Sequence, residues 1–167
     1  MNVWEPSCNV GHMAAPLGDY FGRVYASDIK DYGYALMDGV WDFLQADLPP
    51  WLSPEIDAVI CNPPYNGAED FIQRALLVPG VECVAAITRL NFLESVGRYK
   101  RLFRDQPPSV VAQFVERVPM FHGRLDPTGS TATAYAWLVW SKGWDTATEL
   151  RWIPPCRDKL ERPGDYL

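Results

Sequence analysis

The stretch Ala58-Val59-Ile60-Cys61-Asn62-Pro63-Pro64-Tyr65 is the part of the sequence on which the interpretation of the fold depends. Its apolar first half predicts a buried strand over 56–61. The prolines lack the backbone N–H that would continue a strand, so the chain is expected to leave it in a rigid, extended conformation. An asparagine, backbone carbonyls and an aromatic ring would then stand at the carboxyl end of a strand. This arrangement suits the holding of a flat group that carries an NH2; an ordinary strand-ending turn is the alternative.

Strand-like and helix-like segments alternate on both sides of this stretch. Besides 56–61, apolar or β-rich runs predict strands over 2–4, 23–27, 81–88, 110–118 and 133–140. Helical spacing predicts helices over 12–17, 69–78 and 91–104. The nearly all-apolar run 81–88 is typical of a strand buried on both faces of a parallel sheet. We therefore expect an α/β fold with a mostly parallel central sheet, an antiparallel final strand and helices on both faces.

The composition is that of a single globular domain. The chain has 167 residues, of which 48% are hydrophobic and 13% aromatic. No apolar run approaches the ~20 residues of a membrane helix, and no secretory leader is evident. The four cysteines lack zinc-ligand spacing, so we expect reduced thiols, no metal site and a cytoplasmic location. Because the net charge is -6, contact with nucleic acid would need a local basic patch.

Polar side chains follow several strand-like segments directly: Glu5, Asp28, Asp42 and Asn62. In parallel sheets, ligands collect at this edge. The small-residue loop 5–11 would let backbone N–H groups approach a ligand, and Asp28 could accept hydrogen bonds from a ribose diol. Asp42 could accept from an exocyclic amine of an adenine ring, with Phe43 beside the ring. The respective alternatives are a structural turn, a helix N-cap and a surface turn.

Together these features resemble the S-adenosylmethionine-dependent amino-methyltransferases, specifically the small N6-adenine DNA methyltransferases of phages and prophages. The resemblance runs over almost the whole chain, and Asn62-Pro63-Pro64-Tyr65 is its specific part. Trp4 to Met13 looks like the family's cofactor loop, Ala26-Ser27-Asp28 like its ribose-binding acid, and Asp42-Phe43-Leu44 like its adenine-contacting segment. The stretches 117–120 and 136–140 are also similar to it.

The resemblance implies a Rossmann-like methyltransferase fold in one catalytic domain over 1–167, with S-adenosyl-L-methionine as cofactor and N6 of adenine in DNA as the methyl acceptor. The implied catalytic residues are Asn62, Pro63, Pro64 and Tyr65. The implied cofactor contacts are Glu5, Pro6, Ser7, Cys8, Gly11, Asp28, Ile29, Asp42, Phe43 and Asn62. Candidate substrate contacts, including members of a basic run and of the loop 119–133, are Tyr65, Arg89, Arg98, Arg101, His122 and Arg124. For the basic run, a solvated helix face is the alternative.

The chemistry of these residues agrees with the implied reaction. The lone pair of an adenine N6 is delocalised into the ring, and the Asn62 side-chain oxygen and the Pro63 carbonyl can accept its two hydrogens. Tyr65 can stack on a base that has been flipped out of a duplex. Cys8 and Cys61 are interpreted as packing residues. The same tetrapeptide is also used on RNA bases and on protein glutamine amides, and an inactive methyltransferase-like binding subunit is a further alternative.

Two features depart from the family pattern. Asn9 stands where the family usually has glycine, and asparagine is the non-glycine residue that best tolerates a left-handed backbone. The chain also begins at its first strand, where the family has a preceding helical segment. We therefore expect either a minimal form or a cofactor pocket completed by a C-terminal element, a homodimer or a partner subunit.

Overall fold

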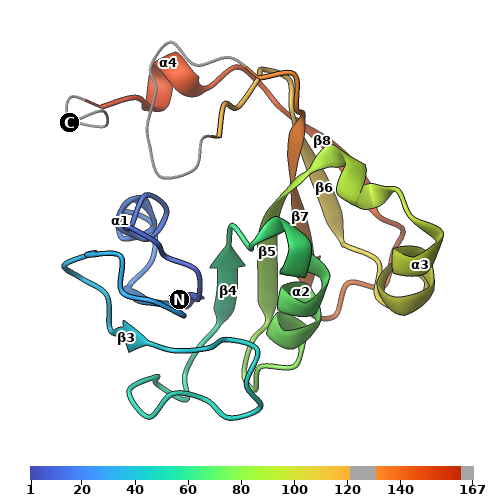
Figure 1. Cartoon of the computed structure of the whole chain (residues 1–167). Coiled ribbons are helices and arrows are strands. Elements are labelled where there is room, and N and C mark those ends of the chain that lie inside the picture. Colours follow the sequence, from blue (N-terminus) through green and yellow to red (C-terminus); the bar gives the residue numbers. More distant parts are fainter. Residues whose placement is uncertain (121–130, 163–167) are drawn as a thin grey trace.

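The computed structural model describes residues 1–120 and 131–162. Within these residues, eight strands form one sheet in the order β3-β2-β1-β4-β5-β7-β6-β8 (Figure 1). The strands are β1 (Asn2–Glu5), β2 (Arg23–Asp28), β3 (Gly39–Val40), β4 (Ala58–Cys61), β5 (Cys83–Arg89), β6 (Val110–Phe114), β7 (Tyr135–Ser141) and β8 (Glu149–Ile153).

The sheet is parallel apart from one strand. The neighbours from β3 to β5 pair in parallel, β7 runs antiparallel to both β5 and β6, and β8 pairs in parallel with β6. This confirms the predicted α/β class with its mostly parallel sheet. The antiparallel strand lies between β5 and β6, and it is followed in the chain by β8.

Helices cover both faces of the sheet, as predicted (Figure 1). They are α1 (Ala14–Leu17), α2 (Ala68–Leu76), α3 (Val96–Arg98), α4 (Arg157–Leu160), the narrower 3-10 turns η1 (Tyr65–Gly67) and η2 (Leu90–Leu93), and the wider π turn η3 (Tyr99–Phe103). Along β4, alternate side chains pack against the helices on opposite faces of the sheet. Val59 and Cys61 belong to the large core under α2, whereas Ile60 packs on the other face with Leu17 of α1.

The large core explains why the strand ends are held firmly. Trp4 of β1 is fully buried, and its ring meets that of Phe43 edge-on at 4.9 Å between centroids. Phe43 in turn lies 5.0 Å from the ring of Phe71 on α2. Aromatic pairs of this kind contribute about 0.5–1.5 kcal/mol beyond the burial of their area. The segment after β3 is thereby fixed against both β1 and α2.

The strand predicted over 110–118 ends earlier, at Phe114, and three further elements differ from the sequence-based prediction. The helix predicted over 91–104 is broken, because η2 ends at Leu93 and the Ser95 hydroxyl accepts the N–H of Arg98 at 3.3 Å, which starts a new helix. β3 was not predicted; it is only two residues long, too short to show a pattern in the sequence. β8 was not predicted; most of its side chains are exposed, so it has no buried face to mark it.

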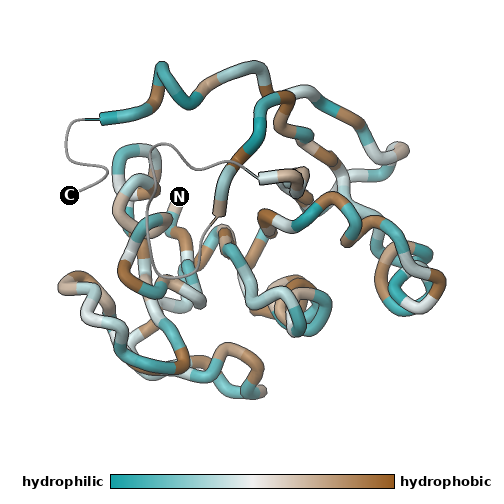
Figure 2. Tube along the Cα trace, turned by 45° about the horizontal axis from the view of Figure 1, so that its top comes forward, coloured by the Kyte–Doolittle hydropathy of each residue, from teal (hydrophilic) through white to brown (hydrophobic). Residues whose placement is uncertain are grey.

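Polar and apolar residues alternate over short distances along the whole described chain (Figure 2). Among residues 1–120 and 131–162, no helix has both the length and the apolar character needed to cross a bilayer.

Candidate functional site

The carboxyl ends of β1, β2 and β4 meet at one edge of the sheet, because β1 lies between β2 and β4 and is parallel to both. Glu5 ends β1, Asp28 ends β2, and Asn62 directly follows β4. The Ser7 hydroxyl links two of these positions, since its Oγ lies 3.4 Å from Glu5 Oε1 and 3.1 Å from the Asn62 carbonyl oxygen. The structure thus brings together residues that the sequence places far apart.

The loop after β1 turns sharply with its N–H groups held by β2. The N–H of Cys8 donates to the Ser27 carbonyl, and the N–H of Asn9 donates to Asp28 Oδ2, both at 2.9 Å. Asn9 has a φ of 48°, so it adopts the left-handed conformation that its place in the loop required. Pro6 is fully buried beneath the loop. Asn9 therefore supports this turn without a glycine.

Gly11 lets this loop approach another segment closely. Its φ is +87°, and a Cβ added there would lie 2.2 Å from the ring of Tyr34. We expect Gly11→Ala to lower the free energy of unfolding by about 2–4 kcal/mol, through left-handed strain and the displaced ring. Gly33→Ala is the matched control: its φ is +90°, but nothing lies within 4 Å of the added Cβ. Urea unfolding of both variants measures the difference, and equal losses would show that the contact with Tyr34 costs nothing.

Glu5 and Asp28 form a buried acidic pair with no countercharge. Their exposed fractions are 1% and 8%, and within residues 1–120 and 131–162 neither forms an ion pair with a lysine or arginine. Burial, and then the charge of Asp28, raises the pKa of Glu5 to about 8, although hydrogen bonds from Ser7 oppose this. Glu5 Oε2 has no hydrogen-bond partner among the described residues. A cationic ligand beside this buried acidic pair would therefore be attracted to it.

The thiols of Cys8 and Cys61, near the acidic pair, are not nucleophiles. Burial raises the pKa of Cys8 to about 12 and also raises the pKa of Cys61, which is fully buried. Both thiols are therefore protonated at neutral pH. This agrees with their interpretation as packing residues.

The predicted cofactor contacts at the end of β2 and after β3 differ in how far they are exposed. The backbone N–H of Trp41 donates to the Asp28 carbonyl at 2.8 Å. This hydrogen bond brings Asp42 toward the end of β2. Ile29, directly after Asp28, is 65% exposed and offers an apolar surface there. Phe43, in contrast, is 2% exposed and belongs to the core, so its ring has no face left for a ligand. The expectation that Phe43 lies beside a bound ring is corrected accordingly.

The backbone of Asn62 to Tyr65 is rigid and leaves one carbonyl unused. Pro64 has φ -59° and ψ 132°, the extended exit that the prolines predicted. The Asn62 carbonyl accepts from Ser7 and the Pro64 carbonyl accepts the N–H of Gly67 at 2.9 Å. Within the described part of the chain, neither the Pro63 carbonyl nor the exposed side chain of Asn62 has a hydrogen-bond partner. Both oxygens thus keep their capacity to accept hydrogen bonds, with Asn62 exposed and Pro63 buried.

Tyr65, at the start of η1, contacts two residues that come from other strands. Its hydroxyl lies 3.0 Å from that of Tyr135, and the guanidinium carbon of Arg89 lies 4.0 Å from the centre of its ring. The Tyr65 ring is still 46% exposed. Burial, followed by the hydrogen bond with Tyr135, raises the pKa of Tyr65, so the phenol is neutral at ordinary pH. Arg89 was an expected substrate contact; Tyr135 was not predicted, because it resembles any aromatic residue of an apolar strand.

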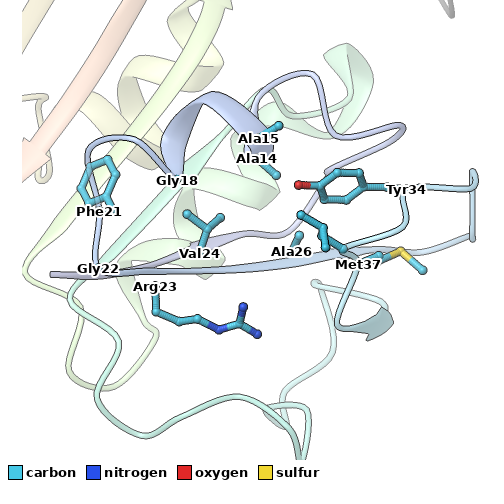
Figure 3. Close-up of a pocket in the computed structure, with 11 residues that line it drawn as sticks. Ala14, Ala15, Gly18, Phe21, Gly22, Arg23, Val24, Ala26, Tyr34 and Met37 are labelled. Atoms are coloured by element: carbon cyan, nitrogen blue, oxygen red, sulfur yellow. The ribbon is translucent and has the colours of Figure 1, made fainter.

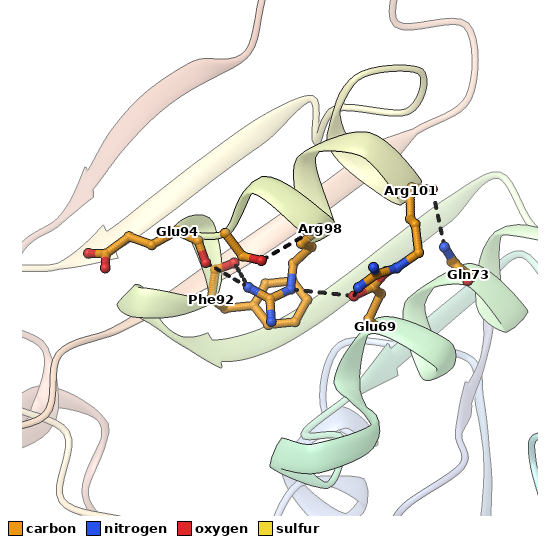
Figure 4. A network of polar contacts seen from close by, with 7 residues as sticks. Glu69, Gln73, Phe92, Glu94, Arg98 and Arg101 are labelled. Carbon is orange, nitrogen blue, oxygen red and sulfur yellow. Dashed lines mark hydrogen bonds and ion pairs between the residues drawn. The ribbon is translucent and has the colours of Figure 1, made fainter.

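The other predicted substrate contacts are engaged elsewhere or lie outside the described residues. Arg101 forms two hydrogen bonds with the Glu69 carboxylate, at 2.6 and 2.8 Å (Figure 4). Arg98 lies 3.8 Å from the same carboxylate and donates to the carbonyls of Phe92 and Glu94. Both arginines thus hold η2 and α3 against α2, which weakens their case as substrate contacts. His122 and Arg124 lie outside the described residues.

A separate groove of about 500 Å³ lies beside β2, on the face of the sheet that carries α1 (Figure 3). Small and apolar side chains from α1, β2 and the following connection line it, including Ala14, Gly18, Val24 and Tyr34. None of Glu5, Asp28, Asn62 and Tyr65 lines this groove. It is therefore distinct from the candidate site.

Comparison with known proteins gives matches among solved structures. No protein-family profile matches the sequence, and no curated protein sequence matches it. A type I restriction-modification system methyltransferase subunit from Streptococcus thermophilus matches over 99% of this chain and 44% of its own, with 11% identity and a TM-score of 0.64. A putative class I S-adenosylmethionine-dependent methyltransferase from Listeria monocytogenes matches over 92% and 58%, with 14% identity and a TM-score of 0.59.

A dimethyladenosine transferase from Plasmodium falciparum matches over 84% of this chain and 54% of its own, with 16% identity and a TM-score of 0.53. The present chain thus spans about half the length of these structures. At these identities the similarity concerns the fold. It confirms that the chain has the Rossmann-like methyltransferase fold.

Proposed function

We propose that this protein is a methyltransferase that transfers a methyl group from S-adenosyl-L-methionine to an exocyclic amino nitrogen, with N6 of adenine in DNA as the acceptor. The observation that carries the proposal is the short link through Ser7. It joins the buried acidic pair, which would attract a cation, to a rigid motif with two oxygen acceptors that could bind an amine. A methyltransferase needs both halves within one site.

The acidic half fits the proposed cofactor. When bound, S-adenosylmethionine supplies an electrophilic methyl group on a positively charged sulfur. Glu5 and Asp28 would offset this positive charge, and the unpartnered Oε2 of Glu5 would gain a partner. Asp28 would also accept hydrogen bonds from the ribose, Ile29 would give its exposed apolar surface to the adenine ring, and Asp42 would accept from the adenine amine.

The acceptor half fits an amino group on a conjugated ring. The Asn62 side-chain oxygen and the Pro63 carbonyl would accept its two hydrogens, which draws the nitrogen toward a tetrahedral geometry and frees its lone pair for the methyl group. Pro63 and Pro64 fix the backbone, so little rearrangement is needed as charge develops. The alignment of donor and acceptor accounts for much of the expected acceleration.

The open face of Tyr65 favours a nucleobase over an amide. A base stacked on an aromatic side chain gains about 1–3 kcal/mol, whereas a glutamine side chain has no comparable flat surface. The similarity of fold to a restriction-modification methyltransferase subunit and to a dimethyladenosine transferase supports the same choice. The base would have to leave the duplex to reach this ring.

Transfer of a tritiated methyl group tests the proposal. Unmethylated DNA, RNA and a glutamine-containing protein extract are offered in parallel with labelled S-adenosylmethionine. We expect label in DNA, recovered as N6-methyladenine after digestion. Label in RNA or protein alone would keep the chemistry and change the acceptor. No label in any of the three, with calorimetry also showing no cofactor binding, would overturn the proposal; cofactor binding without transfer would point to a binding subunit.

A further inference from the structure

The short turn that carries Tyr65, η1, does not by itself fix the orientation of the Tyr65 ring. η1 is a single turn of three residues, directly after two prolines, and the Tyr65 side chain is 46% exposed. An exposed aromatic ring usually exchanges between rotamers on a fast timescale. A ring that must meet an incoming base in one orientation needs contacts from outside its own turn.

Two neighbouring strands supply such contacts. Arg89 ends β5 and Tyr135 begins β7, and the antiparallel register places the two directly opposite each other. The ladder continues beyond them, because Leu90 donates its N–H to the Ala134 carbonyl at 2.8 Å. Tyr135 is 4% exposed, so its own position is fixed by the sheet and its surroundings. The pair is therefore a rigid platform beside η1.

The two contacts restrain different parts of the Tyr65 ring. The hydroxyl-to-hydroxyl distance of 3.0 Å to Tyr135 fixes the far end of the phenol. The guanidinium of Arg89, 4.0 Å from the ring centre, covers one face. An arginine is planar and permanently charged, so it can lie flat on this face and be attracted by the ring electrons. With one end and one face held, the opposite face is the one left for an acceptor.

We propose that Arg89 and Tyr135 are positioning residues that hold the Tyr65 ring as a preset stacking surface for the acceptor base. The proposal rests on the proposed function, which it deepens. In the complex, the guanidinium, the phenol and the base would form three layers. Arg89 and Tyr135 act through Tyr65, so their loss should affect the rate of transfer from bound substrate more than the binding of cofactor.

Kinetics with an oligonucleotide substrate test the effect on transfer. We expect Tyr135→Phe, which removes only the hydroxyl, to lower kcat about fivefold to tenfold with the KM for S-adenosylmethionine unchanged. Arg89→Met should lower kcat by a similar factor, and Arg89→Lys should recover part of it, because lysine keeps the charge without the flat fork. Tyr99→Phe, at a tyrosine that is 56% exposed, is the control and should match the wild type. An unchanged kcat in both Tyr135→Phe and Arg89→Met would overturn the proposal.

A measurement without substrate separates this proposal from the proposed function. Ring-labelled tyrosine allows the order of the Tyr65 ring to be measured by NMR relaxation, with its signal identified by Tyr65→Phe. We expect a rigid ring in the wild type and, in Tyr135→Phe and Arg89→Met, mobility near that of Tyr20, which is 70% exposed. A protein without transferase activity could still pass this test. A Tyr65 ring as mobile as Tyr20 in the wild type would refute the positioning role whatever the activity.

Discussion

Replacement of Asn62 by alanine is expected to lower the rate of methyl transfer by about a hundredfold to a thousandfold while leaving the binding of S-adenosylmethionine nearly unchanged. The Asn62 side chain is exposed, and within the described residues it makes no hydrogen bond, so its loss should cost the fold little. Its backbone carbonyl, which accepts from Ser7, is retained in the variant. What disappears is one of the two acceptors for the hydrogens of the amine.

Single-turnover transfer, calorimetry with the cofactor and thermal unfolding together check this expectation. Asn91→Ala is the control, because Asn91 is also an exposed asparagine that follows a strand end. Full transfer activity in Asn62→Ala would refute the role assigned to the side chain. Loss of cofactor binding together with activity would instead assign Asn62 to the cofactor half of the site.

Replacement of Glu5 by glutamine is expected to raise the stability of the ligand-free protein at pH 8 but not at pH 4.5. The pKa of Glu5 is raised from 4.5 to about 8, so between these values the unfolded chain releases a proton that the folded chain keeps. The stabilising effect of the protonated carboxyl is complete below the unfolded pKa and is lost as the pH rises through the folded value. The free energy of unfolding should fall by about 3–5 kcal/mol in total over this pH range. Glutamine resembles the protonated acid and does not titrate.

Thermal unfolding of both proteins at several pH values measures the effect. The Tm difference should grow steadily from pH 4.5 to pH 8, and Glu55→Gln, at an exposed site with the same change of charge, is the control. In the presence of S-adenosylmethionine at pH 8 the wild type should instead have the higher Tm of the two proteins, because the cofactor's positive charge favours the carboxylate of Glu5. A Tm difference that stays constant over the pH range would refute the raised pKa.

The sequence was sufficient for the parts of the site that depend on strand ends. Glu5, Asp28 and Asn62 each follow an apolar run, and parallel pairing of those runs is enough to bring their ends to one edge. Asn9 was also interpretable, because only a few residue types tolerate a φ of 48°. These inferences needed no knowledge of side-chain packing.

The sequence was insufficient where a residue's role depends on which side chain it meets. Tyr135 is 70 positions from Tyr65, and nothing in an apolar strand distinguishes a tyrosine that reaches a site from one in the core. Arg98 and Arg101 are typical of a basic surface, but Glu69 on α2 neutralises them. Phe43 is adjacent to Asp42 in sequence, yet the core under α2 takes its ring.

The reversed direction of β7 has a practical consequence for handling the protein. Because β7 runs against its neighbours, the turn that follows it lies beside the start of β5, where Lys142 donates its N–H to the Glu82 carbonyl at 2.8 Å. That is the edge of the sheet opposite the strand ends that carry Glu5 and Asn62. Residues 142–145 of this turn are all exposed. A dye or an immobilising tether attached at this turn would leave access to the other edge open.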